Sequence, residues 1–291
     1  MTEASLGYRR AAPDDLAGSI RVKVARHRDR TRPVITESHG VLRLMHPLYL
    51  DDSGQLTYIV MNPGGAYFGE AYRYDIDLGP NSSLLLSSQA ATRIHRTPTR
   101  PAVQETTIVL GSGSRLEYVP DQLIAYRDAD YRQFTTIVAA PDAQGFFAEA
   151  VTPGWDPDDS KFTYSGIHLR LDIRAAGHAG LVCTDNVRLR PSEIDQAIDG
   201  LGYLEGASHM GSILVFGPHI DDGYEDCVRG TVTQSGLAKA GVTRGSRHGV
   251  AWLMVRALAN STDELNRLTL AVNELDRSVT TGQSRMDLRR Y

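Results

Sequence analysis

The sequence predicts a mainly β protein, an elongated domain of many short strands with one or two α-helices near the C-terminus. Segments in which apolar and polar residues alternate recur along most of the chain, and turn-forming residues separate them. The clearest stripe of apolar residues at helical spacing lies close to the C-terminus. Successive strands could stack as coils of a helix-like β-structure or form a sandwich, because alternation with a period of two fits both.

Strands are predicted wherever this alternation, or a short apolar run between turns, is clear. Residues 72–78 alternate without an exception, and residues 83–88 are apolar enough to be buried on both faces. Residues 27–32 are charged and predict a turn. The predicted strands cover residues 19–25, 41–45, 57–61, 72–78, 83–88, 103–110, 115–119, 131–140, 145–151, 167–173, 181–189, 212–216 and 250–258.

The strongest helix signal begins at Ser261. Ser261 and Glu264 form a capping box, and an apolar stripe continues until Gly282, a typical helix stop. Residues 192–199 could form a short helix, and residues 222–228 could be helical or irregular. We expect a single domain over residues 19–282, with residues 1–18 and 283–291 as loose ends.

Composition excludes several classes of protein. The 291 residues carry a net charge of −4, so no general basic field attracts nucleic acid. The only cysteines, Cys183 and Cys227, are too few and too far apart for a disulfide scaffold or a thiolate zinc site. No run of about 18 apolar residues is present, and the first residues lack the charged and apolar regions typical of a signal peptide. We therefore expect a cytoplasmic protein that does not act at a membrane.

Catalytic signatures are missing from the sequence. It has neither a phosphate-binding Gly-x-x-x-x-Gly-Lys loop nor a Gly-x-Ser-x-Gly elbow, and its nine histidines are scattered. Gln89, Thr92 and Arg93 follow a buried strand, where they could line a polar passage, bind a partner, or satisfy backbone groups at a strand end. Glu117 alternates with Leu116 and Tyr118, which permits either a surface or a channel-lining position.

Three motifs, in this order, are similar to those of the urease accessory protein UreD family, also called UreH. They are Asn62-Pro63-Gly64-Gly65 with Gly69 soon after, Ser88-Gln89-Ala90-Ala91-Thr92-Arg93-Ile94, and Leu116-Glu117-Tyr118-Val119-Pro120-Asp121. Each motif alone is weak, but their order and spacing are fairly specific. The resemblance runs from about residue 19 to about residue 279.

The resemblance implies a scaffold and not an enzyme. Proteins of this family bind the urease apoprotein, a helical accessory protein (UreF) and, through it, a GTPase (UreG). The assembly delivers nickel to urease, along a passage through the UreD-like protein. The implied fold is a helix-like arrangement of strands with two helices. The resemblance implies no tightly bound cofactor, but a transient passage of Ni²⁺.

The chain departs from the family pattern at two positions. The family commonly has Gly-Gly-Asp where this chain has Gly69-Glu70-Ala71, which leaves Glu70 as the only nearby acid. It often has an aromatic residue in place of His95, whose imidazole suits nickel. We expect Glu70, His95 and Glu117 as transient nickel ligands. The residues expected to line the passage or bind partners are Asn62, Gly64, Gly65, Gln89, Thr92, Arg93 and Asp121.

Two other hypotheses remain at the level of sequence. One is a β-helical or β-sandwich enzyme that acts on carbohydrate, with Glu117 and Asp121 as paired acid and base. Low aromatic content, 7%, speaks against it because sugar sites need exposed rings for stacking. The other is a structural β protein without a role in metal transfer.

Overall fold

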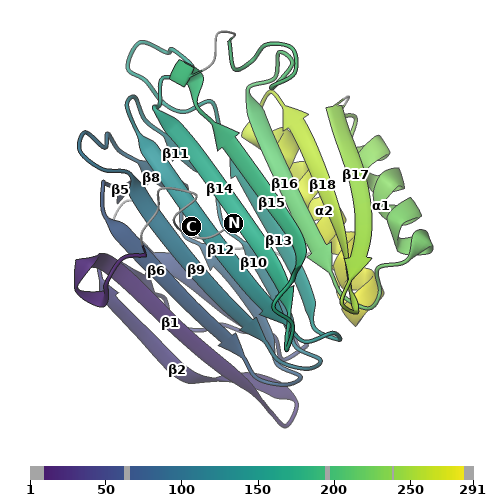
Figure 1. Cartoon of the computed structure of the whole chain (residues 1–291). Coiled ribbons are helices and arrows are strands. Elements are labelled where there is room, and N and C mark those ends of the chain that lie inside the picture. The colour runs from purple at the N-terminus through teal and green to yellow at the C-terminus, as the bar shows by residue number, and fades with distance from the viewer. Residues whose placement is uncertain (1–9, 62–65, 194–196, 238, 285–291) are drawn as a thin grey trace.

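The computed structural model describes residues 10–61, 66–193, 197–237 and 239–284. Two β-sheets pack face to face, and two α-helices cover one of them (Figure 1). Sheet A has seven strands in the order β15-β14-β12-β9-β6-β1-β2. They are β1 (Leu16–His27), β2 (Arg30–Gly40), β6 (Ala71–Leu78), β9 (Ala102–Leu110), β12 (Asp130–Ala139), β14 (Gly166–Ala175) and β15 (Leu181–Leu189).

Sheet B has a main path of strands in the order β17-β18-β16-β13-β10-β7-β4-β3, and three further short strands pair outside this path. The strands of the main path are β3 (Arg43–Leu44), β4 (Leu56–Met61), β7 (Ser83–Ser88), β10 (Arg115–Val119), β13 (Gln144–Val151), β16 (His209–Phe216), β17 (Lys239–Arg247) and β18 (Val250–Ala259). The short strands are β5 (Ala66–Tyr67), β8 (Thr92–Ile94) and β11 (Leu123–Ala125).

The chain winds repeatedly from sheet B through a short strand into sheet A. Three successive coils are β4-β5-β6, β7-β8-β9 and β10-β11-β12, and corresponding strands pair in parallel. A fourth coil runs from β13 to β14, with Trp155 bridging to Tyr126 in place of a short strand. The structure is therefore a solenoid, which confirms the prediction of a helix-like β-structure.

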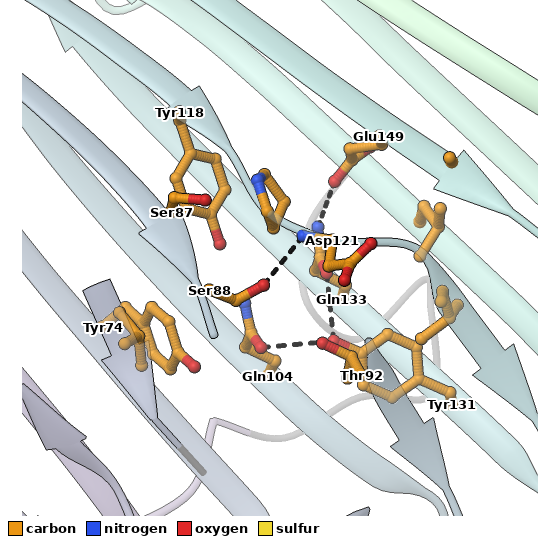
Figure 2. Close-up of a pocket in the computed structure, with 15 residues that line it drawn as sticks. Tyr74, Ser87, Ser88, Thr92, Gln104, Tyr118, Asp121, Tyr131, Gln133 and Glu149 are labelled. Atoms are coloured by element: carbon orange, nitrogen blue, oxygen red, sulfur yellow. Dashed lines mark hydrogen bonds between the residues drawn. The ribbon is translucent and has the colours of Figure 1, made fainter. Parts of the chain in front are cut away.

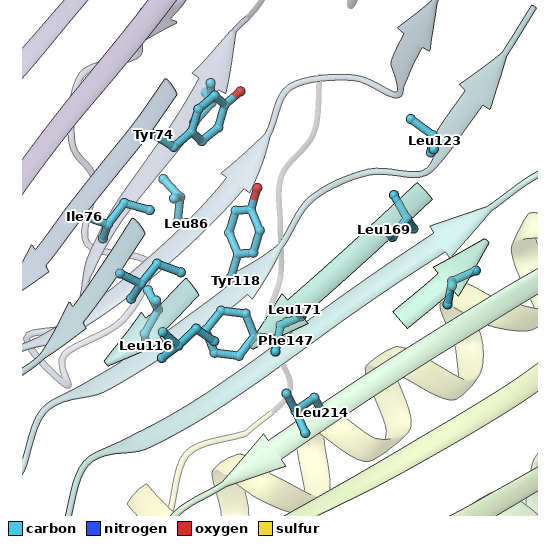
Figure 3. Close-up of a cluster of buried hydrophobic side chains, with 14 of the residues drawn as sticks. Tyr74, Ile76, Leu86, Leu116, Tyr118, Leu123, Phe147, Leu169, Leu171 and Leu214 are labelled. Carbon is cyan, nitrogen blue, oxygen red and sulfur yellow. The ribbon is translucent and has the colours of Figure 1, made fainter. Parts of the chain in front are cut away.

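The core lies between the two sheets, because each central strand turns every second side chain inward. Figure 3 shows part of it: Ile76 of sheet A and Leu86, Leu116 and Phe147 of sheet B meet in the interior. The alternate, outward side chains of β10, β13, β16 and β18 form a second apolar cluster with the helices. Sheet B is thus buried on both faces, which explains the unbroken apolar run of β7.

The helices are α1 (Asp222–Gln234) and α2 (Thr262–Thr281), so the predicted one or two helices are two. The predicted capping box begins α2: the Ser261 hydroxyl accepts from the Glu264 N–H at 3.3 Å, and the Glu264 carboxylate accepts from the Asn260 N–H at 2.8 Å. Gly282 ends the helix with a φ of 68°. Among the described residues, no helix is long and apolar enough to cross a membrane.

Several local predictions were wrong, chiefly at sheet edges. Residues 27–32 include the start of β2, the strand predicted at 41–45 shrinks to Arg43–Leu44, and β17 was not predicted. Both β2 and β17 are edge strands that bury almost no side chains, so they lack an apolar alternation. In the predicted helix at 192–199, Pro191–Glu193 forms a 3-10 turn, and residues 194–196 lie outside the described part.

Candidate functional site

A row of hydrogen-bonded polar side chains crosses the space between the sheets. Its members, in order along the solenoid and hereafter the polar row, are Tyr74, Tyr67, Gln104, Tyr131, Gln133 and Glu149. From Tyr74 to Gln133 the bonded oxygen atoms lie 2.8 to 3.3 Å apart. The Gln133 amide then donates to the Glu149 carboxylate. The polar row connects all four coils.

The polar row exists because polar residues occupy inward positions of otherwise apolar strands. Gln104 shares the inward face of β9 with Ile108, and Gln133 shares that of β12 with Ile137. Glu149 lies between the inward residues Phe147 and Val151 of β13. Sequence reasoning missed these residues, although a polar side chain in the apolar phase of a strand is a usable signal.

A small cavity opens beside the polar row near the carboxyl ends of β7 and β10 (Figure 2). Its volume is about 40 Å³, room for about three water molecules. Besides residues of the polar row, it is lined by Ser88, Thr92, Asp121 and Tyr118. Two of the predicted passage residues, Thr92 and Asp121, therefore lie at this cavity.

The cavity environment perturbs the pKa of the Glu149 carboxyl group. Burial raises its pKa to about 7, and the negative charge of Asp185 adds to the rise, while the Gln133 amide and the Arg256 guanidinium oppose it. At neutral pH this group therefore exchanges a proton readily, and a nearby cation would favour its charged form. Burial also raises the pKa of the Tyr67, Tyr74 and Tyr131 hydroxyls, which stay protonated.

Glu70 lies near the other end of the polar row. Its carboxylate accepts a hydrogen bond of 3.0 Å from the Tyr72 hydroxyl, and the Tyr72 ring stacks on that of Tyr67 with centroids 3.8 Å apart. Glu70 also lines an open pocket of about 280 Å³ together with Arg10, Arg100 and Arg132. It therefore lies between this open pocket and the buried rings of Tyr72 and Tyr67.

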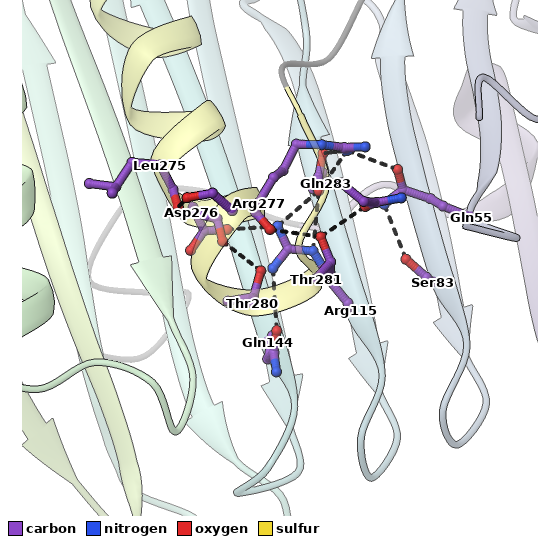
Figure 4. A network of polar contacts seen from close by, with 12 residues as sticks. Gln55, Ser83, Arg115, Gln144, Leu275, Asp276, Arg277, Thr280, Thr281 and Gln283 are labelled. Atoms are coloured by element: carbon purple, nitrogen blue, oxygen red, sulfur yellow. Dashed lines mark hydrogen bonds and ion pairs between the residues drawn. The ribbon is translucent and has the colours of Figure 1, made fainter. Parts of the chain in front are cut away.

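Glu117 does not reach the cavity, because its side chain points to the opposite face of sheet B. It is fully buried beneath α2, where its carboxylate lies 2.8 Å from Nη1 of Arg277 and 2.9 Å from Nη2 of Arg115. Asp276 lies 2.7 Å from the same nitrogen of Arg115 (Figure 4). Glu117 and Asp121 face different spaces and cannot act as an acid–base pair.

His95 also points away from the cavity. It stacks on Phe68 and makes a tilted contact with Tyr126, with ring centroids 4.9 and 4.7 Å apart, and the centroids of Tyr126 and Trp155 lie 4.9 Å apart. Burial lowers the pKa of His95, as does the charge of Arg93, so the ring is neutral at pH 7. Here His95 continues a ladder of rings, one from each coil, whose outer members Phe68 and Trp155 are about half exposed.

The remaining predicted residues divide into two groups. The Gln89 side chain is exposed, and Arg93, between the cavity-lining Thr92 and the buried Ile94, alternates to the outer face. Asn62, Gly64 and Gly65 lie outside the described residues. The structure thus brings Glu70, Thr92 and Asp121 to the polar row or its cavity, and separates them from Glu117 and His95.

The donor atoms of this site are almost all oxygens: carboxylates, amide carbonyls and hydroxyls. Within the described residues, no group of three or more His, Cys, Asp or Glu side chains is placed to hold a metal ion. Hard and borderline divalent cations accept such oxygen donors, but only weakly when few carboxylates are present. The arrangement can therefore contact a passing cation without trapping it.

Fold and site together define a class: a β-solenoid with a polar interior row and two helices docked on one sheet. The family described as UreD urease accessory protein matches residues 16–290, and the chain belongs to that family. This membership confirms the resemblance seen in the motifs. It also confirms that the chain is not an enzyme, since the family is one of accessory proteins.

Several relatives bear the description "Urease accessory protein UreD". The one from Arthrobacter sp. (strain FB24) is 42% identical over 278 residues, which cover 94% of both chains. That from Actinomyces naeslundii is 42% identical over 275 residues, 94% of this chain and 98% of the relative. A more distant relative from Corynebacterium glutamicum is 35% identical over 265 residues, covering 90% and 93%. The similarity therefore extends over nearly the full length of each protein.

Proposed function

We propose that the protein is a scaffold in urease maturation that passes Ni²⁺ along its polar interior to the urease apoprotein. Family membership supports the role in maturation. The observation that supports the passage of nickel is the polar row, which carries oxygen donors through four coils of an otherwise apolar core. The partners are the urease apoprotein, a UreF-like helical protein and, through it, a UreG-like GTPase, all in the cytoplasm.

The chemistry of the row fits transient contact. Tyrosine hydroxyls and glutamine amides replace part of the water shell of a cation, and only Glu149 and Asp121 add carboxylates at the cavity. A Ni²⁺ ion that loses water in the core gains weak oxygen ligands at each coil, so no single position holds it. Glu70 offers a carboxylate where the row approaches solvent.

Nickel loading of co-expressed urease tests this function. We expect the double variant Glu149→Gln and Asp121→Asn to lower the nickel content of urease several-fold, because it removes both cavity carboxylates and keeps their size. Asp77→Asn is the control, since Asp77 pairs with Lys23 on the exposed face of sheet A. Co-purification with urease and the accessory proteins must be unchanged in both. Full nickel loading by the double variant would contradict passage along the polar row.

A further inference from the structure

Beyond Glu149, polar side chains continue across the inner face of sheet B from β13 to β18. Glu149 of β13 lies opposite Ser212 of β16, and Ser212 lies opposite Arg256 of β18. All three occupy inward positions, in phase with Phe147, Leu214 and Met254. A line of polar side chains therefore runs from the cavity to β18, the strand next to the edge strand β17.

Arg256 closes this line by joining the two sheets. Its Nη2 lies 2.5 Å from Oδ1 of Asp185 on β15 of sheet A, and its Nη1 donates to the Ser212 hydroxyl at 2.7 Å. The Arg256 side chain is 33% exposed and that of Asp185 is 15% exposed. The guanidinium therefore lies between the interior and solvent.

Two carboxylates surround the position of Arg256: Asp185 pairs with it directly, and Glu149 interacts with it electrostatically. Asp185 and Arg256 both act on Glu149, the first raising and the second lowering its pKa, so the two carboxylates share one electrostatic environment. A guanidinium that pairs with Asp185 supplies the positive charge that this environment requires. A metal cation and the guanidinium would compete for the same position, since both need the same negative charges.

We propose that Arg256 is the gate of the polar row: its guanidinium occupies a divalent-cation position formed by Asp185, Glu149 and the Ser212 hydroxyl, and a cation enters or leaves there only when Arg256 is displaced. This inference rests on the proposed function, because it assigns one end of the same passage. When no metal is present, the Arg256 guanidinium balances the negative charge of the carboxylates at this position.

Titration of the full-length chain with Ni²⁺ by calorimetry tests the gate. We expect Arg256→Ala to bind Ni²⁺ about tenfold more tightly than the unaltered chain, because the competing charge is gone. Adding Asp185→Asn to that variant should abolish the gain. Arg188→Ala is the matched control, since it removes a positive charge from the exposed face of the same strand as Asp185 and should leave the affinity unchanged.

A second variant separates the effect of the missing charge from an effect of misfolding. Arg256→Gln keeps a polar side chain of similar length, and thermal unfolding verifies that either variant is folded. The proposal is overturned if both folded variants bind Ni²⁺ no more tightly than the unaltered chain, or if Arg188→Ala tightens binding as much. The two proposals can fail separately. If the Arg256 variants bind Ni²⁺ more tightly but the Glu149 and Asp121 double variant still loads urease fully, the cation position at Arg256 is supported and the passage of nickel along the polar row is contradicted.

Discussion

A few polar side chains make the interior between the two sheets partly polar. Gln104, Gln133 and Glu149 stand where their strands would otherwise place apolar residues, and each finds a partner in a neighbouring coil. Because a buried polar group without a partner is costly, these residues are stable only as a connected set. Glu149 has the most demanding position, since it carries a carboxyl group whose charged form burial disfavours.

Glu149 should make the protein less stable as pH rises from 4.5 to about 7. Its folded-state pKa of about 7 lies above the ordinary value of 4.5, so the folded state holds the proton more tightly. The resulting stability is fully present below pH 4.5 and is lost as pH rises to about 7, a difference on the order of 3 kcal/mol. Glu149→Gln should remove this dependence and be more stable than the unaltered chain at pH 8.

Urea unfolding at a series of pH values measures the effect. Glu37→Gln serves as the control, because Glu37 is exposed on the edge strand β2 and forms only a loose pair of 3.9 Å with Arg21. Its pH profile should match that of the unaltered chain. Identical profiles for Glu149→Gln and the unaltered chain would show that Glu149 is not protonated in the folded state at neutral pH.

At the scale of elements, the docking of α2 on sheet B depends on buried charges as well as apolar packing. Arg115 and Glu117 of β10 meet Asp276 and Arg277 of α2, and all four side chains are at most 6% exposed. Two positive and two negative groups balance, and His219 adds a hydrogen bond of 2.9 Å to Asp276. The helix is thereby held at one position on the sheet, since a shift would leave charges buried without partners.

Arg277→Met should destabilise the protein by about 3–5 kcal/mol, because it leaves Glu117 buried with a single cationic partner. Chemical denaturation monitored by circular dichroism measures the loss. Arg229→Met on α1 should cost much less, since its pair with Glu225 is exposed to solvent. Combining Arg277→Met with Glu117→Gln should recover part of the loss. A double variant less stable than expected from simple addition would contradict this pairing.

The whole molecule is held together by the pairing of successive coils. Each central strand of sheet A has neighbours on both sides, whereas β2 and β17 end their sheets. The edge strands bury few side chains, and the two helices stabilise only one face of sheet B. Stability is therefore expected to be highest in the central coils and lowest at the two ends of the solenoid.

Hydrogen exchange followed by mass spectrometry should reproduce this gradient. Amides of β9 and β12 should exchange slowest, because each strand is paired on both sides and turns its inward side chains into the core. Those of β2 and β17 should exchange fastest among the long strands. Slower exchange in β17 than in β12 would contradict a solenoid stabilised from its middle coils.

The sequence by itself determined the strand-rich class, most central strands and the C-terminal helix, because period-two alternation and the Ser261 capping box are local signals. It also predicted Thr92 and Asp121 as passage or partner residues, and the structure places both at the polar cavity. Only the tertiary structure decided that Glu117 belongs to a buried network and His95 to an outer ring ladder. The physical reason is that alternation tells which residues share a face of a strand, whereas the packing of coils and helices decides what that face meets.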